Sequence, residues 1–326
     1  MAALPQPAVC VVGAALVDLI AYVPRLPRVG ETLHGTGFRI GHGGKGANQA
    51  VMAALLGARV SMLTRVGRDV FGEGMLENFR ARGVDTTHVL VTEDAPSGVA
   101  PIAVDPNGDN AIVIVTGANE RLTPDDVERA RGAIAAADVV VCQLEIPLEV
   151  TEAALRVARE ESARTILNPA PAVEDLPGRL YGLADVLCPN ELETELLLGR
   201  PLEPGREADA AAELVARGAG SVILTLGERG CLVHAGGEPT RLPADAVDAV
   251  DTTGAGDAFV GSLAYFLARG EPLLEAAARA NRIAAISVQR PGTQTSFPAA
   301  DALPEELYAA SSAASRPKAE APSSES

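Results

Sequence analysis

The segment 251–257, with the sequence DTTGAGD, combines two carboxylates with small residues, and an alanine-rich helical pattern continues over residues 257–268. Small residues leave backbone N–H groups accessible where a helix begins. Such an end binds anions and can stabilise the charge that develops when a phosphoryl group moves. A lone Asp at this position more often only caps the helix. The Gly-Ala-Gly run and the second acid, Asp251, favour a chemical role for Asp257.

A glycine-rich run at residues 41–46, GHGGKG, formally matches the GxGxxG pattern of dinucleotide-binding loops. Its setting is wrong for that function, because the first strand and turn lie earlier, around residues 9–13, and no acidic residue closes a second strand ~20 residues further on. The glycines can instead let the backbone approach a small ligand while Asn48 hydrogen-bonds its hydroxyls. A plain glycine-rich turn before a helix explains the same letters.

Two shorter motifs follow predicted strands. Asn190 and Glu193 have the spacing of a capping box, which favours a plain helix start, although the same pair could orient a hydrated Mg²⁺ and the phosphates of a nucleotide. Residues 225–230, TLGERG, could place backbone against a nucleotide, and a simple turn predicts the same letters. The chain contains neither a GxxxxGK[ST] loop nor the protein-kinase signatures, so ATP would have to be held another way.

The elements that must position these residues alternate along the chain. Short apolar runs rich in β-branched residues predict strands at 9–12, 112–115, 139–142 and 222–226, with weaker ones at 165–167 and 185–187. Alanine- and leucine-rich segments predict helices at 47–56, 72–82, 125–136, 148–161, 208–217, 257–268 and 273–287. The alternation predicts a doubly wound α/β fold with a mostly parallel sheet, which places ligands at the carboxyl ends of the strands.

Two stretches, 19–40 and 98–115, break this alternation, because Pro and Gly interrupt their apolar residues without a helical period. We expect antiparallel strands that form a small subdomain. The last residues, 310–326, are rich in Ser, Ala, Pro and Glu and predict a disordered tail. No repeat or linker divides the rest, so we expect one domain over residues 8–305.

Composition restricts the partners. The formal charge of the 326-residue chain is −16, from 27 Lys and Arg against 43 Asp and Glu, and this field repels nucleic acids. The four cysteines show no CxxC or metal-ligand spacing, which predicts buried, reduced thiols. No apolar stretch reaches the ~20 residues of a membrane span, and the N-terminus lacks signal-peptide features, so a cytoplasmic protein is expected.

Taken together, GGKGANQA at residues 43–50 and DTTGAGDAFVG at 251–261 resemble the two signatures of the ribokinase or PfkB family of carbohydrate kinases. The shorter motifs QLEIP, CPNELE, TLGERG and SVQRPGTQTS follow the order of that family from about residue 9 to residue 304. The resemblance implies an α/β fold whose central, mostly parallel sheet is flanked by helices and carries a small β-sheet lid, from about 18–42 and 97–116. It also implies a homodimer through the lids.

The resemblance further implies roles for individual residues. Asp257 would be the catalytic base, and the anion hole would be formed by Gly254, Ala255 and Gly256. The sugar would be contacted by Asp18, Gly44, Lys45, Gly46, Ala47, Asn48 and Glu145. The nucleotide would be contacted by Asn190, Thr225, Leu226, Gly227, Glu228, Arg229, Gly230, Gly256 and Asn281. Glu193 would act on Mg²⁺ indirectly, and a K⁺ site would be formed by Asp251, Thr253, Ser287, Arg290, Gly292 and Ser296.

The implied reaction is transfer of the γ-phosphate of ATP to O5 of D-ribose, with Mg²⁺ required and K⁺ as activator. Two positions depart from the family pattern. Leu16 lies where bacterial members carry an Asn that contacts the sugar, and His42 replaces a frequent Phe. The alternatives are therefore a related kinase for deoxyribose, fructose, a ketodeoxy acid or a nucleoside, or a sugar sensor without catalysis. A nicotinamide oxidoreductase is a more distant alternative.

Overall fold

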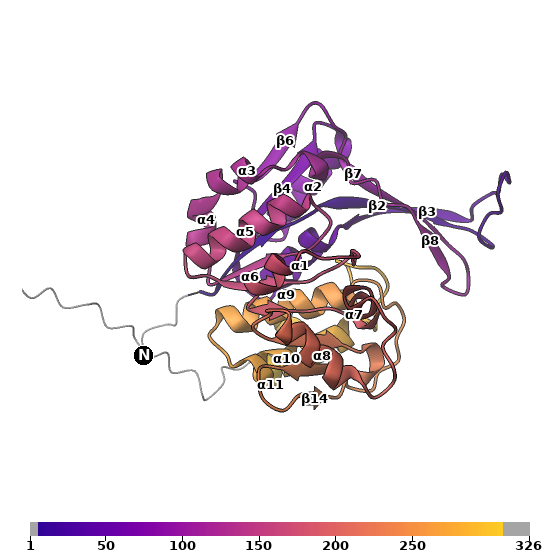
Figure 1. The fold of residues 1–326 in the computed structure, drawn as a ribbon. Coiled ribbons are helices and arrows are strands. Elements are labelled where there is room, and N and C mark those ends of the chain that lie inside the picture. Colours follow the sequence, from indigo (N-terminus) through magenta and orange to yellow (C-terminus); the bar gives the residue numbers. More distant parts are fainter. Residues whose placement is uncertain (1–5, 309–326) are drawn as a thin grey trace, which may run out of the picture.

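The computed structural model of the protein describes residues 6–308, and a narrow sheet projects from its layered body (Figure 1). The predicted tail, residues 310–326, lies outside the described part. Within residues 6–308, no helix combines the length and the apolar character needed to cross a membrane. The prediction of buried, reduced thiols is confirmed, because the structure has free, buried cysteines at Cys10, Cys142, Cys188 and Cys231.

The body is built on a ten-stranded sheet in which the order is β14-β13-β12-β11-β10-β9-β1-β4-β5, and β6 also pairs with β4. The pairs from β12 to β5 and the β4–β6 pair are parallel, whereas β13 and β14 are antiparallel. The predicted mostly parallel sheet is confirmed. Its strands are β1 (Ala8–Val12), β4 (Arg59–Gly67), β5 (Val84–Asp85), β6 (Val89–Thr92), β9 (Val139–Cys142), β10 (Arg164–Leu167), β11 (Val186–Leu187), β12 (Val222–Thr225), β13 (Cys231–His234) and β14 (Thr240–Leu242).

Helices cover both faces of this sheet. In the central strand β1, Val9 and Val11 belong to one hydrophobic cluster, whereas Cys10 and Val12 belong to the other. Because successive side chains point to opposite faces, a strand covered on both faces is apolar at every position. The helices are α1 (Lys45–Leu55), α2 (Val70–Ala81), α3 (Pro124–Arg129), α4 (Arg131–Ala135), α5 (Leu148–Glu160), α6 (Gly178–Leu183), α7 (Glu191–Leu198), α8 (Glu207–Ala216), α9 (Ala255–Ala268), α10 (Leu273–Ser287) and α11 (Glu305–Tyr308).

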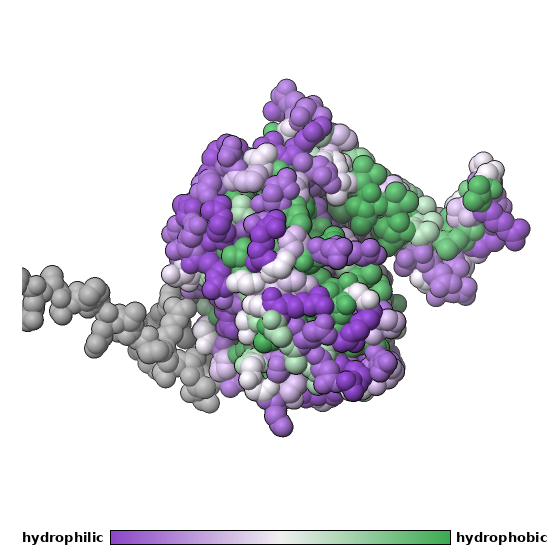
Figure 2. All heavy atoms as spheres, viewed as in Figure 1, coloured by the Kyte–Doolittle hydropathy of each residue, from purple (hydrophilic) through white to green (hydrophobic). Residues whose placement is uncertain are grey.

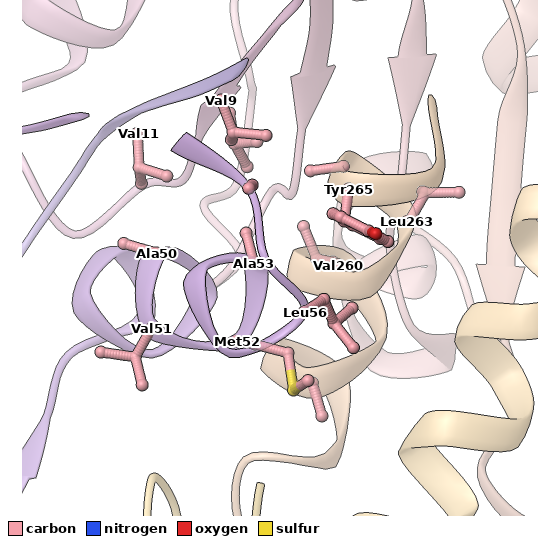
Figure 3. Packing of buried hydrophobic residues seen from close by; sticks show 14 of the residues in the cluster. Val9, Val11, Ala50, Val51, Met52, Ala53, Leu56, Val260, Leu263 and Tyr265 are labelled. Atoms are coloured by element: carbon pink, nitrogen blue, oxygen red, sulfur yellow. The ribbon is translucent and has the colours of Figure 1, made fainter. Parts of the chain in front are cut away.

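Helices α1 and α9 lie side by side in the first of these clusters (Figure 3). The two helices are packed tightly at Gly261, where an added Cβ would lie 2.6 Å from the carbonyl oxygen of Gln49 and 2.7 Å from Cβ of Met52. Only a glycine allows two helix backbones to come this close. Asp257 lies one helical turn before Gly261, so the same contact brings this carboxylate beside α1.

The projecting sheet is the predicted lid, and its strand order is β3-β2-β7-β8. Its strands are β2 (Leu16–Tyr22), β3 (Gly37–Gly43), β7 (Gly98–Val104) and β8 (Asn110–Ile112). The expectation of antiparallel strands is wrong for the central pair, because β2 and β7 are parallel, whereas the pairs β2–β3 and β7–β8 are antiparallel. Both central strands leave the body in the same direction, and each returns through its own hairpin partner.

Other elements also differ from the prediction, and β5, β6, β13, β14 and α6 were not predicted. The apolar run 112–115 belongs to the exposed lid, and β8 ends at Ile112, so it is no strand of the buried sheet. The helix predicted over 125–136 is broken at Ala130, whose φ and ψ of −91° and 3° end α3 before α4 begins. Strand β4 was not predicted, because the polar residues Ser61 and Thr64 interrupt its apolar pattern.

We expect Gly261→Ala to lower the free energy of unfolding by about 1–3 kcal/mol, because the new methyl group overpacks the contact between α1 and α9. The matched control is Gly132→Ala in α4, where an added Cβ meets no atom within 4 Å. This control should raise stability by up to about 1 kcal/mol, since alanine favours a helix over glycine. Urea unfolding measures both variants, and a stabilising Gly261→Ala would contradict the close approach.

Candidate active site

The carboxylate of Asp257 is only 7% exposed and lies in the first turn of α9. It does not cap the helix, because the N-cap residue is Gly254 and no side chain makes a cap hydrogen bond. The side chain instead accepts two hydrogen bonds from α1. Asn48 Nδ2 donates to Oδ2 and Gln49 Nε2 donates to Oδ1, each at 2.9 Å. The structure therefore excludes the simple capping explanation for this acid.

The start of α9 opens into a cavity of about 170 Å³. Gly254 has a left-handed φ of 79°, and a Cβ there would lie 2.5 Å from Thr293 Cγ2, so the turn requires glycine. Gly256 has open space where a side chain would stand. The N–H of Ala255 donates to Thr252 O at 3.2 Å, so an anion would compete for this donor. The positive end of the helix dipole thus faces the cavity beside Asp257.

The cavity brings together residues that lie far apart in the sequence. Its walls are formed by Lys45, Asn168, Ala170, Cys188, Asn190, Glu193, Thr225, Gly254, Gly256, Asp257 and Val260. These residues follow the carboxyl ends of β10, β11 and β12 or begin α1 and α9. The predicted sugar-side, nucleotide-side and catalytic residues Lys45, Thr225 and Asp257 therefore share one cavity.

Lys45 is the cation of this cavity. Burial alone would lower the pKa of its ammonium group, but the charges of Asp257, Glu145 and Glu193 outweigh burial and raise the pKa. Its backbone N–H also donates to Glu145 Oε2 at 2.8 Å. Burial raises the pKa of Glu145 to about 7 against the opposing charge of Lys45, and burial likewise raises the pKa of Glu193 to about 7. The site thus holds one ammonium group among several acids.

Asn190 and Glu193 form the predicted capping box at the start of α7. Asn190 Oδ1 accepts from the Glu193 N–H at 2.8 Å, and Glu193 Oε2 accepts from the Asn190 N–H at 2.8 Å. The second carboxylate oxygen, Oε1, accepts from Asn190 Nδ2 at 2.9 Å. The structural explanation of this motif is confirmed, and the same two side chains also line the cavity.

The TLGERG segment begins at the carboxyl end of β12, and only Thr225 reaches the cavity. Leu226 is buried, Glu228 is exposed, and Gly227–Arg229 form a 3-10 helix. Gly230 has a φ of 84°, and a Cβ there would lie 2.0 Å from Leu242 O.

Two of the predicted nucleotide residues are engaged elsewhere. Arg229 forms ion pairs with Glu191 and Glu207. Asn281 donates to Pro243 O at 2.8 Å. Both side chains therefore hold neighbouring loops in this structure.

A larger cavity, of about 470 Å³, separates the lid from the body. Asp18 lines it from β2, and burial, followed by the charge of Asp257, raises the pKa of Asp18 to about 6. The predicted sugar residues Gly44, Gly46, Ala47 and Asn48 lie at the start of α1, beside Lys45, and none of them lines either cavity. A Cβ on Gly44 would lie 2.7 Å from the Leu16 backbone nitrogen, so this turn cannot accommodate a side chain.

The residues of the predicted K⁺ site are only partly brought together. Asp251 accepts from the N–H of Thr253 at 2.9 Å through Oδ1 and from the N–H of Gly292 at 2.8 Å through Oδ2. The hydroxyls of Ser287 and Ser296 donate locally, to Ala284 O and Thr293 O, both at 2.8 Å. Arg290 is exposed.

Sequence reasoning missed the buried amides that surround the carboxylate of Asp257. Gln49 and Asn168 bond to one another and Gln49 bonds to Asp257, while Gln294 donates to Asn48 Oδ1 at 3.0 Å. Gln49 stands inside the GGKGANQA motif, where a second polar residue beside Asn48 in an otherwise apolar helix was the available signal.

Glu145 makes the stability of the unliganded protein depend on pH. Between its ordinary pKa of 4.5 and the raised value of about 7, the folded chain retains a proton that the unfolded chain releases. The corresponding stability is present below the lower value and is lost as the pH rises through the higher one.

We therefore expect Glu145→Gln to be more stable than the wild type above pH ~7, by on the order of 3 kcal/mol, and equally stable below pH ~4.5. Urea unfolding across this pH range tests the expectation, with the exposed Glu149→Gln as control. A Glu145→Gln variant that is less stable than the wild type above pH ~7 would contradict the raised pKa of Glu145.

Residues 6–300 match the model of the pfkB family of carbohydrate kinases. Among curated proteins, the chain is 45% identical over 306 residues to the ribokinase of Mus musculus, covering 92% of this chain and 95% of the relative. It is 41% identical over 300 residues to the deoxyribokinase of Salmonella typhi, covering 92% and 98%.

Among solved structures, the ribokinase of Arabidopsis thaliana complexed with ribose and ATP superposes with a TM-score of 0.84 at 30% identity, covering 94% of this chain and 100% of that one. This likeness confirms the predicted ribokinase-like architecture of sheet, helices and lid. The chain belongs to the pfkB family of carbohydrate kinases and is a phosphotransferase with an alcohol group as acceptor.

Proposed function

We propose that this protein transfers the γ-phosphate of ATP to O5 of D-ribose, giving D-ribose 5-phosphate. The observation that carries the proposal is the position of Asp257, a buried carboxylate at the start of α9 that opens into the cavity lined by Lys45 and Gly256. The identity of 45% to a mouse protein named ribokinase supports ribose as the sugar.

In the proposed mechanism, the sugar lies under the lid against Asp18, Asn48 and Glu145. Asp257 accepts the proton of the terminal hydroxyl, and that oxygen attacks the γ-phosphorus in line while ADP leaves. The two amide donors hold both carboxylate oxygens of Asp257 in position. A loose phosphoryl-transfer transition state depends on positioning more than on a strong base. The N-terminal end of α9 and the Lys45 ammonium stabilise the transferred charge.

Within residues 6–308, no cluster of three or more His, Cys, Asp or Glu could hold a metal ion. Mg²⁺ usually binds through substrate phosphates and retained waters rather than in an all-protein cage. Glu193 fits such a site, since its carboxylate lines the cavity and both oxygens are fixed by Asn190. When bound, Mg²⁺ neutralises charge on the phosphates. Glu193 would orient one of its waters.

The loop around Asp251 supports a K⁺ site that acts indirectly. The N–H groups of Val250 and Asp251 donate to Val288 O at 2.8 and 3.1 Å, and the Gly292 N–H donates to Asp251. This places the segment just before Gly254 against the segment at 288–292. A cation held here by oxygen atoms would shape the start of α9 without touching the substrate. The carboxylate oxygens of Asp251 each retain capacity for one further contact.

The lid supports a homodimer. The lid exposes large apolar side chains (Figure 2), which are Tyr22, Phe38, Ile40, Ile112, Val113, Ile114 and Val115. Three of them, Tyr22, Ile40 and Ile112, line the cavity between the lid and the body. Exposed apolar patches of this kind mark interaction surfaces. We propose that the lid of a second copy covers them. Analytical ultracentrifugation would show a dimer, and a monomer at all concentrations would refute it.

One kinase domain over residues 8–305 and a cytoplasmic location remain predictions.

We expect Asp257→Asn to retain sugar binding but to lower kcat by at least about a thousandfold, because the amide cannot accept the proton of the alcohol. A coupled ADP-release assay measures kcat, and isothermal titration measures ribose binding. Near-normal turnover would remove Asp257 from the role of base. Glu149→Gln, an exposed change on α5, is a control for handling and folding.

A panel of sugars separates the proposed substrate from its alternatives. Deoxyribose is the specific competitor, since a relative at 41% identity is named deoxyribokinase. Ribose should give the highest kcat/KM among ribose, deoxyribose, fructose, a ketodeoxy acid and a nucleoside, and K⁺ should raise the rate above that in Na⁺. A higher value for deoxyribose would reassign the substrate. Tight ribose binding with no phosphate transfer would favour a sensor.

A further inference from the structure

The side chain of Gln49 is completely buried, yet it uses all of its strong hydrogen-bonding groups. Its Nε2 donates to Asp257 Oδ1 at 2.9 Å and to Asn168 Oδ1 at 3.0 Å. Its Oε1 accepts from Gln143 Nε2 at 2.6 Å. Gln49 does not line either cavity of the site. It therefore contacts the catalytic carboxylate but has no group available for a substrate.

The direction of these hydrogen bonds is determined by a backbone carbonyl. Asn168 Nδ2 donates to Cys188 O at 2.8 Å, and a carbonyl oxygen can only accept. The Oδ1 atom of Asn168 must therefore face Gln49, and Gln49 must donate a hydrogen bond to it from Nε2. A reversed Gln49 would place its own oxygen against two acceptors, Asn168 Oδ1 and Asp257. The chain of amides thus delivers an N–H, and never an acceptor, to the carboxylate.

Gln143 supports the same direction at the other end of Gln49. Among the described residues, the buried Oε1 of Gln143 has no hydrogen-bond partner. Gln143 is thus turned so that its amide nitrogen faces Gln49, although this leaves its own oxygen unsatisfied. This direction agrees with the one set by Cys188 O, because Gln49 Oε1 must then accept.

Asn48 also donates to Asp257, but its own hydrogen bonds differ from those of Gln49. It donates to the other oxygen, Asp257 Oδ2, and accepts from Gln294 Nε2 at 3.0 Å. Nδ2 retains a second hydrogen, and the proposed function gives Asn48 a contact to the sugar. The two carboxylate oxygens therefore have different neighbours. One is held by a buried amide whose two N–H hydrogens are both used, and the other by Asn48, which the proposed function places against the sugar.

We propose that Gln49 is a positioning residue for the catalytic base: it fixes the carboxylate of Asp257 by donating an N–H to Oδ1, without touching the substrate. The proposal rests on the proposed function, in which Asp257 takes the proton of the sugar hydroxyl. The other charged groups around Asp257 are Lys45, Glu145, Glu193 and Asp18, from four different parts of the chain. None of them changes in the variants below.

The test uses two substitutions with different chemistry. Gln49→Met keeps the length of the side chain but removes the N–H, and Gln49→Glu keeps its shape but places a second carboxylate against Asp257. The pH profile of kcat/KM is measured with ribose and MgATP for each. The control is Thr165→Val near the start of β10, which removes a buried hydroxyl that bonds with Leu183 O and Asp185 and makes no hydrogen bond to the amides.

For Gln49→Met we expect kcat to fall on the order of tenfold and the acidic limb of the profile to move to higher pH, because the ionised base loses a donor. For Gln49→Glu the limb should move further, by more than about one pH unit, since two adjacent carboxylates share a proton. The KM values for ribose and MgATP should stay within about twofold. Thr165→Val should lose stability and keep the wild-type profile.

Three results would overturn the proposal. The first is an unchanged acidic limb in either Gln49 variant that folds. The second is a rise in KM at constant kcat, which would assign Gln49 to substrate binding. The third is an equal shift in Thr165→Val, which would make the effect one of general packing. The wild type is assayed first. A wild type that phosphorylates no sugar contradicts the proposed function. An active wild type whose Gln49 variants behave normally contradicts only this inference.

Discussion

The active-site geometry depends on the contact of α1 with α9 at Gly261. This contact lets two helices from opposite ends of the chain approach at backbone distance, so the side chains of Asn48 and Gln49 reach Asp257. Without it, a carboxylate that is 7% exposed would lack partners, and burying an unpaired charge is costly. The same packing that closes the hydrophobic core therefore makes an ionised buried acid possible (Figure 3).

Electrostatics within the cavity differ from those of the whole chain. The chain carries a formal charge of −16, which is unfavourable for a nucleotide. The cavity offsets this locally with the ammonium group of Lys45 and with the N-terminal end of α9. Burial raises the pKa values of Glu145 and Glu193, which reduces their negative charge near neutral pH until a ligand arrives. The lid exposes apolar residues and leaves a cavity between itself and the body.

The prediction of fold class succeeded because both faces of the sheet are covered, which makes strands such as β1 and β9 apolar at every position. Strand β4 was missed because its sequence is not apolar at every buried position. Its Thr64 hydroxyl is buried and donates to Asn119 Oδ1 at 3.2 Å, so a polar letter occupies a core position. The direction of the lid strands was also misjudged, because pairing between β2 and β7 joins segments about 80 residues apart, and no local pattern reports it.

By itself, the sequence determined which residues are available for the chemistry and where helices must begin, since the small residues before Asp257 and the capping pair Asn190 and Glu193 act within a few residues of one another. Only the tertiary structure decided what surrounds the carboxylate. The amides of Gln49 and Asn168 are separated by more than a hundred positions, and their direction depends on one backbone carbonyl at Cys188. Hydrogen bonds between distant segments are properties of the packed core, so local sequence cannot specify them.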